Sequence, residues 1–340
     1  MNTRARERRA FVDTTGWRGG TIEPLSADAS FRSYYRVAGN PLAVLMDAPP
    51  GKEDVRPFMA VTGYLRSLDL SAPEIYAADI ENGFLLLEFL GDERVSQRLK
   101  TAPAEERSLY ERAIDILAHL HATAPTASLP YDGAQYALPA YNEDLLLTET
   151  ALLPDWFVAR GIGAPPSAEA RAQYDALWKA LLADVEGDRG CIVLRDYHVD
   201  NLMCLDERPA LKSLGLLDYQ DAVLGHKAYD LVSLLEDARR DVPRDLARDM
   251  LERYLQGAGI SDAAAFRRAY DLLGAQRNAK IIGVFTRLSR RDGKHAYLQL
   301  IPHVWRLLEE NLDRLGSPGL TAWLNDHAPA EWRRQVLPAK

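Results

Sequence analysis

The sequence predicts a mixed α/β (α+β) fold of two lobes, a small antiparallel sheet with one helix followed by a larger helical lobe. Two observations support this prediction. Strand-like runs separated by turn signals occupy the first ninety or so residues, whereas after Gly91 the apolar residues recur at helical spacing. A chain of 340 residues, 47% of them hydrophobic, is also large enough to bury two cores. We therefore expect one lobe over residues 1–90 and a second over residues 91–340.

The first lobe is expected to contain four strands. The candidate strands are residues 30–37, 42–47, 74–80 and 84–89. Gly39-Asn40-Pro41 separates the first two and Glu81-Asn82-Gly83 separates the last two, and both triplets are turn signals. Between these pairs, apolar residues recur at helical spacing from Val55 to Leu65 and predict one helix. Residues 1–10 carry four arginines and no apolar segment follows, so we interpret this start as frayed.

The second lobe is expected to consist of long helices around one non-helical segment. Apolar stripes at helical spacing predict helices near residues 109–120, 246–254 and 298–308. Residues 191–194 are a candidate strand, and residues 202–205 and 214–217 are able to pair as a hairpin. Such a hairpin would bring Asn201 and Asp218, which flank it, to the same end.

This segment carries three oxygen-bearing side chains at a distinctive spacing. Asp196 precedes Asn201 by five residues, and Asp218 follows an apolar strand. This is the spacing of a kinase catalytic loop and its metal-binding Asp. Asp196 would orient the acceptor hydroxyl and take its proton, while Asn201 and Asp218 would hold Mg²⁺ against the phosphates of ATP. Asp and Asn are also common in turns, so a loop rich in turn residues is the competing interpretation.

Composition argues against several other functions. The net charge of −8 is unfavourable for a nucleic-acid binder, which needs a basic face. No apolar run approaches the length of a membrane span, so we expect a cytoplasmic protein without a membrane partner. Two cysteines, Cys191 and Cys204, make neither a disulfide framework nor a zinc set. The expected partner is a small-molecule acceptor, bound by a monomer.

The loop resembles that of the aminoglycoside phosphotransferase superfamily, relatives of the protein kinases that phosphorylate small molecules. The loop of that family usually reads His-x-Asp-x-x-x-x-Asn, often with a second His two places after the Asp. His198 matches the second His, whereas Leu194 stands in the place of the first. The resemblance implies a protein-kinase-like two-lobe fold and a phosphotransferase that uses ATP and Mg²⁺.

The chain is more closely similar to one bacterial group in this superfamily, the anomeric sugar kinases that act on N-acetylmuramate and N-acetylglucosamine in cell-wall recycling. The matching stretches are residues 28–36, 46–50, 84–88, 217–222, 229–235, 283–288 and 291–294. Met46-Asp47-Ala48-Pro49-Pro50 is the more specific of these, because the others are shared more widely. The resemblance implies phosphorylation of the anomeric hydroxyl, which gives a sugar 1-phosphate.

The nucleotide-binding end departs from common kinases, since Met46 occupies the place of the phosphate-pairing strand lysine and the turn of residues 26–30 lacks a glycine pair. Hydroxyls and backbone amides of that turn could still cradle phosphates. The cations that could replace the lysine are Arg32, Arg36 and Lys52. Adenine is expected to dock on the connector between the lobes through backbone groups within apolar walls. The candidate nucleotide-binding residues are Ser26, Ser30, Arg32, Glu88, Phe89 and Leu90.

The sequence defines the acceptor pocket less well. Sugar sites combine hydroxyl-binding carboxylates with aromatic stacking surfaces, and residues 141–156 offer both, although the same segment fits an ordinary amphipathic helix. Arg287 and Arg291 are four residues apart, so they could share a helix face and hold a substrate carboxylate such as that of a muramate. The acceptor-site candidates are Glu149, Trp156, His198, Gln220, Asp221, Arg287 and Arg291.

The function expected from these observations is an ATP- and Mg²⁺-dependent kinase of N-acetylmuramate or N-acetylglucosamine. Two alternatives remain open. One is a kinase of the same fold for another hydroxyl compound, such as an aminoglycoside, choline or homoserine. The other is a catalytically silent nucleotide-binding scaffold. Met46 and Leu194 favour that scaffold, whereas the presence of Asp196, Asn201 and Asp218 argues against it.

Overall fold

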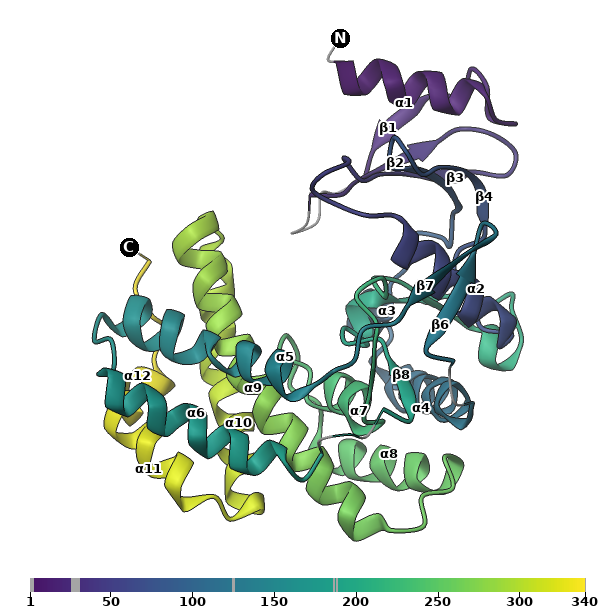
Figure 1. Ribbon diagram of the computed structural model, residues 1–340. Helices are drawn as coiled ribbons and strands as arrows, with labels where there is room; N and C mark the ends of the chain where they lie inside the picture. The colour runs from purple at the N-terminus through teal and green to yellow at the C-terminus, as the bar shows by residue number, and fades with distance from the viewer. Residues whose placement is uncertain (1–2, 26–30, 124–125, 186, 188, 340) are drawn as a thin grey trace. The chain divides into compact units, whose positions relative to one another are not determined.

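The computed structural model describes residues 3–25, 31–123, 126–185, 187 and 189–339 (Figure 1). The chain divides into two compact units. Unit 1 comprises Met1–Ile116, Pro125–Leu138 and Val199–Ala222, and unit 2 comprises Leu117–Ala124, Pro139–His198 and Val223–Lys340. The expected lobe boundary near residue 90 remains a prediction.

The centre of unit 1 is a five-stranded antiparallel sheet in the order β1-β2-β3-β5-β4. Its strands are β1 (Ile22–Pro24), β2 (Ser33–Val37), β3 (Ala43–Asp47), β4 (Ile75–Asp79) and β5 (Phe84–Glu88). The four expected strands are confirmed to within three residues at each end, and the short β1 was not expected. Leu45, Phe84 and Leu86 are buried on one face of the sheet, as the alternation of side chains along paired strands requires.

The expectation of a frayed N-terminus is wrong, because residues Thr3–Asp13 form helix α1. Its Phe11 and Val12 pack against the buried sheet face that includes Leu45. Arg4 and Arg8 both form ion pairs with the buried carboxylate of Asp47, at 2.6 and 3.1 Å. The helix therefore depends on a carboxylate that lies in β3, and no local pattern in the first ten residues indicates that partner.

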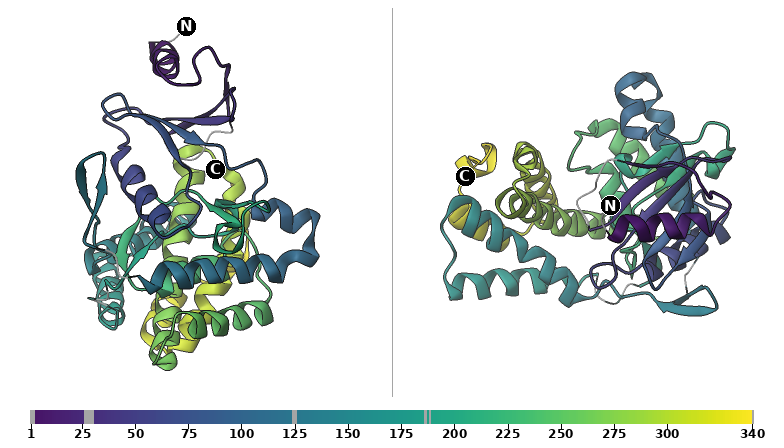
Figure 2. Two further views of the ribbon diagram at one scale, coloured as in Figure 1. Left: turned by 90° about the vertical axis from the view of Figure 1, so that its right-hand side faces the viewer. Right: turned by 90° about the horizontal axis from the view of Figure 1, so that it is seen from above.

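Helix α2, a β-hairpin and several shorter elements complete unit 1. Helix α2 (Arg56–Ser67) lies on the side of the sheet away from α1 (Figures 1 and 2). The hairpin of β6 (Ser128–Tyr131) and β7 (Ala134–Ala137) packs against α2. Further elements are α3 (Val95–Thr101), the first part of α4 (Glu106–Ala122), β9 (Leu202–Cys204), β10 (Leu214–Leu216) and the 3₁₀ turns Pro103–Glu105, Val199–Asn201 and Ala210–Lys212.

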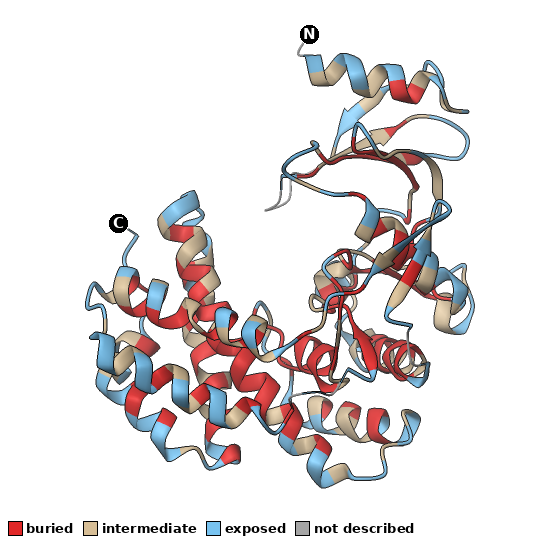
Figure 3. Ribbon diagram, in the orientation of Figure 1, coloured by how far each residue is buried: buried red, intermediate tan, exposed pale blue. Residues whose placement is uncertain are grey.

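Unit 2 is built around the long helix α9 (Ala263–Asp292). The middle of this helix is buried (Figure 3), and it packs against α5, α7, α10 and a π-helical segment. The surrounding elements are α5 (Glu143–Thr150), the π-helix Leu153–Ile162, α6 (Ala168–Leu182), α7 (Ala228–Leu235), α8 (Arg244–Gly257), the 3₁₀ turn His295–Leu300, α10 (Ile301–Leu315), α11 (Pro318–His327) and α12 (Ala330–Arg334). Gly283 of α9 permits close packing, because a Cβ there would lie 2.3 Å from the backbone of Leu152.

One two-stranded sheet completes unit 2. Strand β8 (Cys191–Val193) pairs antiparallel with β11 (Val223–Gly225). The loop that leaves β8 carries Asp196, so this strand pair fixes where the expected catalytic segment begins. Of the helices in the described residues, none combines the length and the apolar character needed to cross a membrane.

Candidate active site

The backbone of the loop after β8 is held by a buried carboxylate. The Leu194 and Arg195 amides donate to Oδ2 and Oδ1 of Asp230 on α7, at 2.7 and 2.8 Å. Arg195 has a φ of 70°, a left-handed conformation that a side-chain-bearing residue adopts at a cost of about 1–3 kcal/mol unless its surroundings fix it. The two hydrogen bonds to Asp230 fix this backbone conformation. They orient the loop although Leu194 stands where the family that this loop resembles usually has a histidine.

Asp196 lies among cations. Burial raises the pKa of Asp196, but Lys280, Arg277 and Arg195, joined by His198 when its ring is protonated, exert a larger opposite effect, so the pKa is lowered from its ordinary value. The carboxylate is therefore ionised at neutral pH. An ionised carboxylate accepts hydrogen bonds only, which is the state that a general base for a hydroxyl group requires.

Two of these cations are held by Glu149, which is 5% exposed. The Glu149 carboxylate forms ion pairs with Arg195 and with the Lys280 ammonium, the latter at 2.8 Å. It also accepts hydrogen bonds from the Tyr141 hydroxyl and, at 3.1 Å, from Gln276 Nε2. Glu149 was expected to bind the acceptor, and in this structure both of its oxygens already have protein partners. Its visible role is to position Arg195 and Lys280.

His198 is buried and contacts Arg239, whose Nη1 lies 3.1 Å from His198 Nε2. Burial and the positive charge of Arg239 lower the pKa of His198, so the ring is neutral at pH 7 and is able to accept a hydrogen bond from Arg239. Arg277 is 3% exposed and donates from Nη2 to the Ser233 hydroxyl at 2.7 Å. Its buried Nη1 has no hydrogen-bond partner among the described residues.

Asn201 and Asp218 lie at the same end of the β9–β10 hairpin, as expected. Leu202 pairs with Leu216, and the next amide, that of Leu217, donates to the Asn201 carbonyl at 3.0 Å. Asp218 has a φ of 56°. Among the described residues, no three His, Cys, Asp or Glu side chains cluster in a way that could hold a metal ion. An amide and a carboxylate are nevertheless suitable hard ligands for Mg²⁺, which takes its other oxygens from phosphates and water.

The Asp218 side chain has close neighbours within unit 1. Gln220 Nε2 donates to Asp218 Oδ1 at 2.8 Å, and Arg32 Nη2 lies 3.5 Å from the same oxygen. The following residue, Tyr219, is anchored on α2, since its hydroxyl lies 2.8 Å from Thr62 Oγ1 and its ring stacks on Phe58 at 5.1 Å. These contacts fix the backbone at Asp218, and sequence analysis gave no role to Tyr219.

The other expected nucleotide-binding residues have varied environments. Ser26 and Ser30 lie outside the described residues. Glu88 forms an ion pair with Arg208, and the guanidinium of Arg36 lies 4.9 Å from the centre of the Phe89 ring. Leu90 is 5% exposed.

The remaining acceptor candidates differ in exposure. Trp156 is half-buried in the π-helix, and Asp221 is exposed. Arg287 is partly exposed, and its pKa is lowered by burial and by the neighbouring charge of Arg291. Arg291 is exposed and forms an ion pair with Asp292 at 2.7 Å.

Helix α9 contributes two cations near Asp196, Arg277 and Lys280, that sequence analysis missed. Arg277, Lys280, Arg287 and Arg291 follow one another at steps of three, seven and four residues, which places them on one stripe of the helix. The stripe runs from the surroundings of Asp196 toward the exposed end of α9. The same helical spacing that paired Arg287 with Arg291 in the sequence could have been extended backward to Lys280 and Arg277.

Comparison with known proteins identifies the family. Residues 21–272 match the phosphotransferase enzyme family. An N-acetylmuramate/N-acetylglucosamine kinase of Caulobacter vibrioides is 36% identical, over 96% of this chain and 97% of that protein. A protein of the same name from Pseudomonas aeruginosa is 39% identical, over 86% of this chain and 83% of that protein.

Solved structures agree at the level of the fold. Aminoglycoside phosphotransferase APH(2'')-Ib, with ADP bound, superposes with a TM-score of 0.57 at 16% identity, over 91% of this chain and 98% of that chain. Ethanolamine kinase of Plasmodium vivax superposes with a TM-score of 0.58 at 10% identity, over 85% and 82% of the two chains. The expected kinase-like fold is thereby confirmed, and the chain is a phosphotransferase that belongs to the phosphotransferase enzyme family.

Proposed function

We propose that this protein is an ATP- and Mg²⁺-dependent kinase that transfers the γ-phosphoryl group to the anomeric hydroxyl of N-acetylmuramate or N-acetylglucosamine, giving the sugar 1-phosphate for cell-wall recycling in the cytoplasm. Relatives at 36% and 39% identity that carry the name of this kinase are the observation that carries the proposal. The ionised carboxylate of Asp196, and the side-chain oxygens of Asn201 and Asp218 from one end of the β9–β10 hairpin, would supply the chemistry that such a transfer needs.

In the proposed reaction Asp196 accepts a hydrogen bond from the acceptor hydroxyl, orients it toward the γ-phosphorus and takes its proton as the new P–O bond forms. An anomeric hydroxyl is more acidic than an ordinary alcohol, so a carboxylate of lowered pKa suffices as the base. Asn201 and Asp218 would hold Mg²⁺, which supplies charge neutralisation on the phosphate oxygens. The leaving group is ADP.

The charge around Asp196 favours a neutral or anionic acceptor. Arg195, Arg277 and Lys280 lie close enough to lower the pKa of Asp196, and Arg287 and Arg291 continue the cationic stripe along α9. A polycationic aminoglycoside or a choline-like cation would be repelled by this stripe, whereas the carboxylate of a muramate would be attracted. We therefore prefer the sugar acceptors over the other acceptors known for this fold.

The test is phosphorus NMR of the purified protein with ATP and Mg²⁺ and, in separate samples, N-acetylmuramate, N-acetylglucosamine and an aminoglycoside. We expect a new sugar 1-phosphate signal, split by the anomeric proton, with at least one amino sugar. The matched control is Asp196→Asn, which keeps the side-chain shape and removes the base, and its turnover should fall by about 10²–10⁴-fold.

Three results would contradict the proposal. Phosphorylation of the aminoglycoside alone would assign a different acceptor. Near-normal turnover by Asp196→Asn would exclude this carboxylate as the base. ATP left unchanged in every sample would favour a catalytically silent nucleotide-binding scaffold.

A further inference from the structure

The ion pair that normally positions ATP phosphates in kinases is absent from this chain on both sides. In protein kinases a lysine of strand β3 pairs with a glutamate of the following helix, and that lysine contacts the phosphates. Here Met46 of β3, which is 1% exposed, replaces the lysine, and helix α2 (Arg56–Ser67) contains no acidic residue. Phosphate charge must therefore be met by a cation from elsewhere.

Arg32 lies directly before strand β2, whose Tyr34 shares a face of the sheet with Met46. Tyr34 of β2 pairs directly with Met46 of β3, so these two side chains lie on one face. Arg32 precedes Tyr34 by two residues, and an extended backbone at that point would direct it to the same face, because successive side chains alternate. The opposite face carries Leu45 and Asp47 and is covered by α1.

Arg32 is held beside the expected metal ligand by several carboxylates. Its side chain is 9% exposed, and its Nη2 lies 3.5 Å from Asp218 Oδ1. Glu53 and Asp221 also act on it electrostatically. The Glu53 carboxylate in turn accepts a hydrogen bond from the Phe31 amide at 3.3 Å, next to Arg32 in the chain. A buried guanidinium among three carboxylates is a fixed positive charge at the edge of the site.

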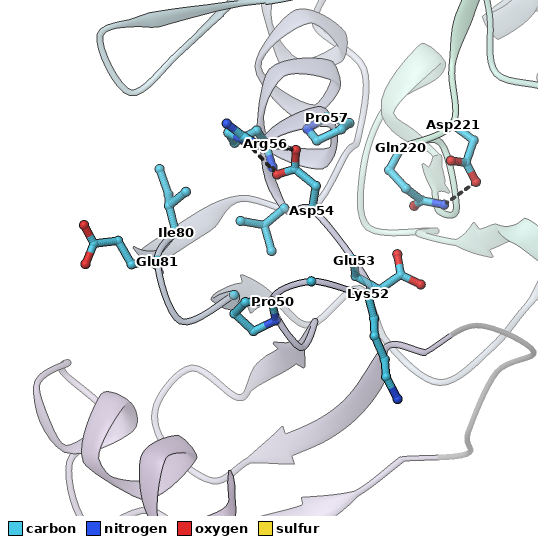
Figure 4. Close-up of a pocket in the computed structure, with 13 residues that line it drawn as sticks. Pro50, Lys52, Glu53, Asp54, Arg56, Pro57, Ile80, Glu81, Gln220 and Asp221 are labelled. Atoms are coloured by element: carbon cyan, nitrogen blue, oxygen red, sulfur yellow. Dashed lines mark hydrogen bonds and ion pairs between the residues drawn. The ribbon is translucent and has the colours of Figure 1, made fainter.

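These carboxylates adjoin an open pocket of about 640 Å³ within unit 1 (Figure 4). Glu53, from the loop before α2, and Gln220 and Asp221, from the loop after β10, line this pocket together. A pocket of this size is in the range that small ligands occupy. A ligand that enters it therefore meets Glu53, Gln220 and Asp221, which are neighbours of Arg32 and Asp218.

The other two cations that could replace the lysine are engaged differently. Arg36 comes four residues after Arg32, which is about 13 Å along an extended chain. It forms an ion pair with Asp92, and its guanidinium lies over the Phe89 ring. Lys52 is exposed and lies 4.9 Å from the centre of the Phe31 ring.

We propose that Arg32 is the cation that binds the nucleotide phosphates, in the place of the missing strand lysine. This inference rests on the proposed ATP-dependent function. When no nucleotide is bound, the guanidinium is balanced by Asp218 and its neighbours. When nucleotide is bound, the guanidinium would donate to a phosphate, whether or not Asp218 holds Mg²⁺, and its planar fork can form two parallel hydrogen bonds with that phosphate.

The test compares affinities for three ligands by isothermal titration calorimetry: ATP with Mg²⁺, ATP with a chelator, and adenosine. The variants are Arg32→Gln, Arg32→Lys and the control Arg9→Gln, which removes an arginine from α1 on the opposite face of the sheet. We expect Arg32→Gln to weaken ATP binding by about 10- to 100-fold with and without Mg²⁺ and to leave adenosine within about twofold. Arg32→Lys should lose less affinity for ATP than Arg32→Gln, and Arg9→Gln should bind ATP with the affinity of the wild type.

Three results for Arg32→Gln would overturn the inference. Unchanged affinity for metal-free ATP would exclude a direct phosphate contact. A loss seen only with Mg²⁺ would mean that Arg32 acts through Asp218. An equal loss for adenosine and ATP would mean that Arg32 supports the fold of the site. A wild-type protein that binds ATP but phosphorylates no sugar would instead overturn the proposed function alone.

Discussion

At the scale of single residues, the reactivity of Asp196 is set by charges that are distant in the sequence. Lys280 and Arg277 come from α9, about eighty residues later, and both lower the pKa of this carboxylate against the effect of burial. Glu149 holds Lys280 in position through an ion pair at 2.8 Å. The pKa of the proposed base is therefore set by a buried network and not by its own loop alone.

Removing the Lys280 charge should shift the pH dependence of the reaction. In the proposed mechanism Asp196 works as a base when it is deprotonated, so its lowered pKa should keep the wild-type enzyme active at acidic pH. In Lys280→Met the pKa of Asp196 should rise, and kcat/KM should begin to fall at a higher pH than in the wild type. The measurement is kcat/KM from pH 4 to 8. Lys179→Met, which removes an exposed lysine of α6, is the matched control.

An acid limb that does not move in Lys280→Met would contradict the electrostatic role of Lys280. A loss of activity that is equal at every pH would indicate a structural role through Glu149 instead.

At the scale of elements, the catalytic loop is positioned by helix α7. Asp230, which is fully buried, accepts from two consecutive amides at the end of β8. Through these hydrogen bonds, α7 and the β8–β11 pair together fix the backbone of the two residues that directly precede Asp196. Sequence analysis recognised Asp230 as part of a matching stretch, but the amides that it binds lie 35 and 36 residues earlier.

We expect Asp230→Asn to destabilise the protein by about 2–3 kcal/mol. The side-chain NH₂ group of the asparagine would face one of the two backbone amides, where the wild type has a charged oxygen that accepts a hydrogen bond. We also expect kcat to fall, by up to about 10²-fold if Asp196 moves by 1 Å. Urea unfolding and steady-state kinetics measure the two effects. Asp326→Asn, an exposed change on α11, should stay within about 0.5 kcal/mol of the wild type. Wild-type stability and kcat in Asp230→Asn would show that these bonds do not hold the loop.

At the scale of the whole molecule, one buried carboxylate joins three helices of unit 2. Glu236 follows α7 and is 7% exposed, and its Oε2 accepts from Asn278 of α9 and Asn311 of α10 at 2.9 and 2.7 Å. Burial raises the pKa of Glu236 to about 7, although Asn311 and Arg314 act in the opposite direction. Folding stability is therefore linked to the protonation of this one group.

The sign of this linkage gives a prediction. The folded protein keeps Glu236 protonated up to about pH 7, whereas the unfolded chain ionises it near pH 4.5. The contribution of Glu236 to stability is therefore full below pH 4.5 and is lost as the pH rises to about 7. Relative to Glu236→Gln, the wild type should lose roughly 1 kcal/mol per pH unit across this window. Urea unfolding of both proteins at pH 5, 6 and 7 measures the difference, and a constant difference would contradict the raised pKa.

The sequence by itself determined the order of the main elements and the candidate catalytic set. Strands β2 to β5, helix α2 and the β9–β10 hairpin follow from local apolar periodicity and turn residues, which act over a few positions. Asp196, Asn201 and Asp218 were predicted because the loop and its hairpin are contiguous, and the hairpin itself brings Asn201 and Asp218 to one end.

Only the tertiary structure decided which charges are paired. The first helix was mistaken for a frayed end because the partner of Arg4 and Arg8 is Asp47 in β3. Glu149 was a candidate acceptor ligand in a segment that also fitted an ordinary amphipathic helix, and in the structure Arg195 and Lys280 occupy its carboxylate. The physical reason is that ion pairing depends on distance in space, and the attraction between two charges does not depend on their separation along the chain.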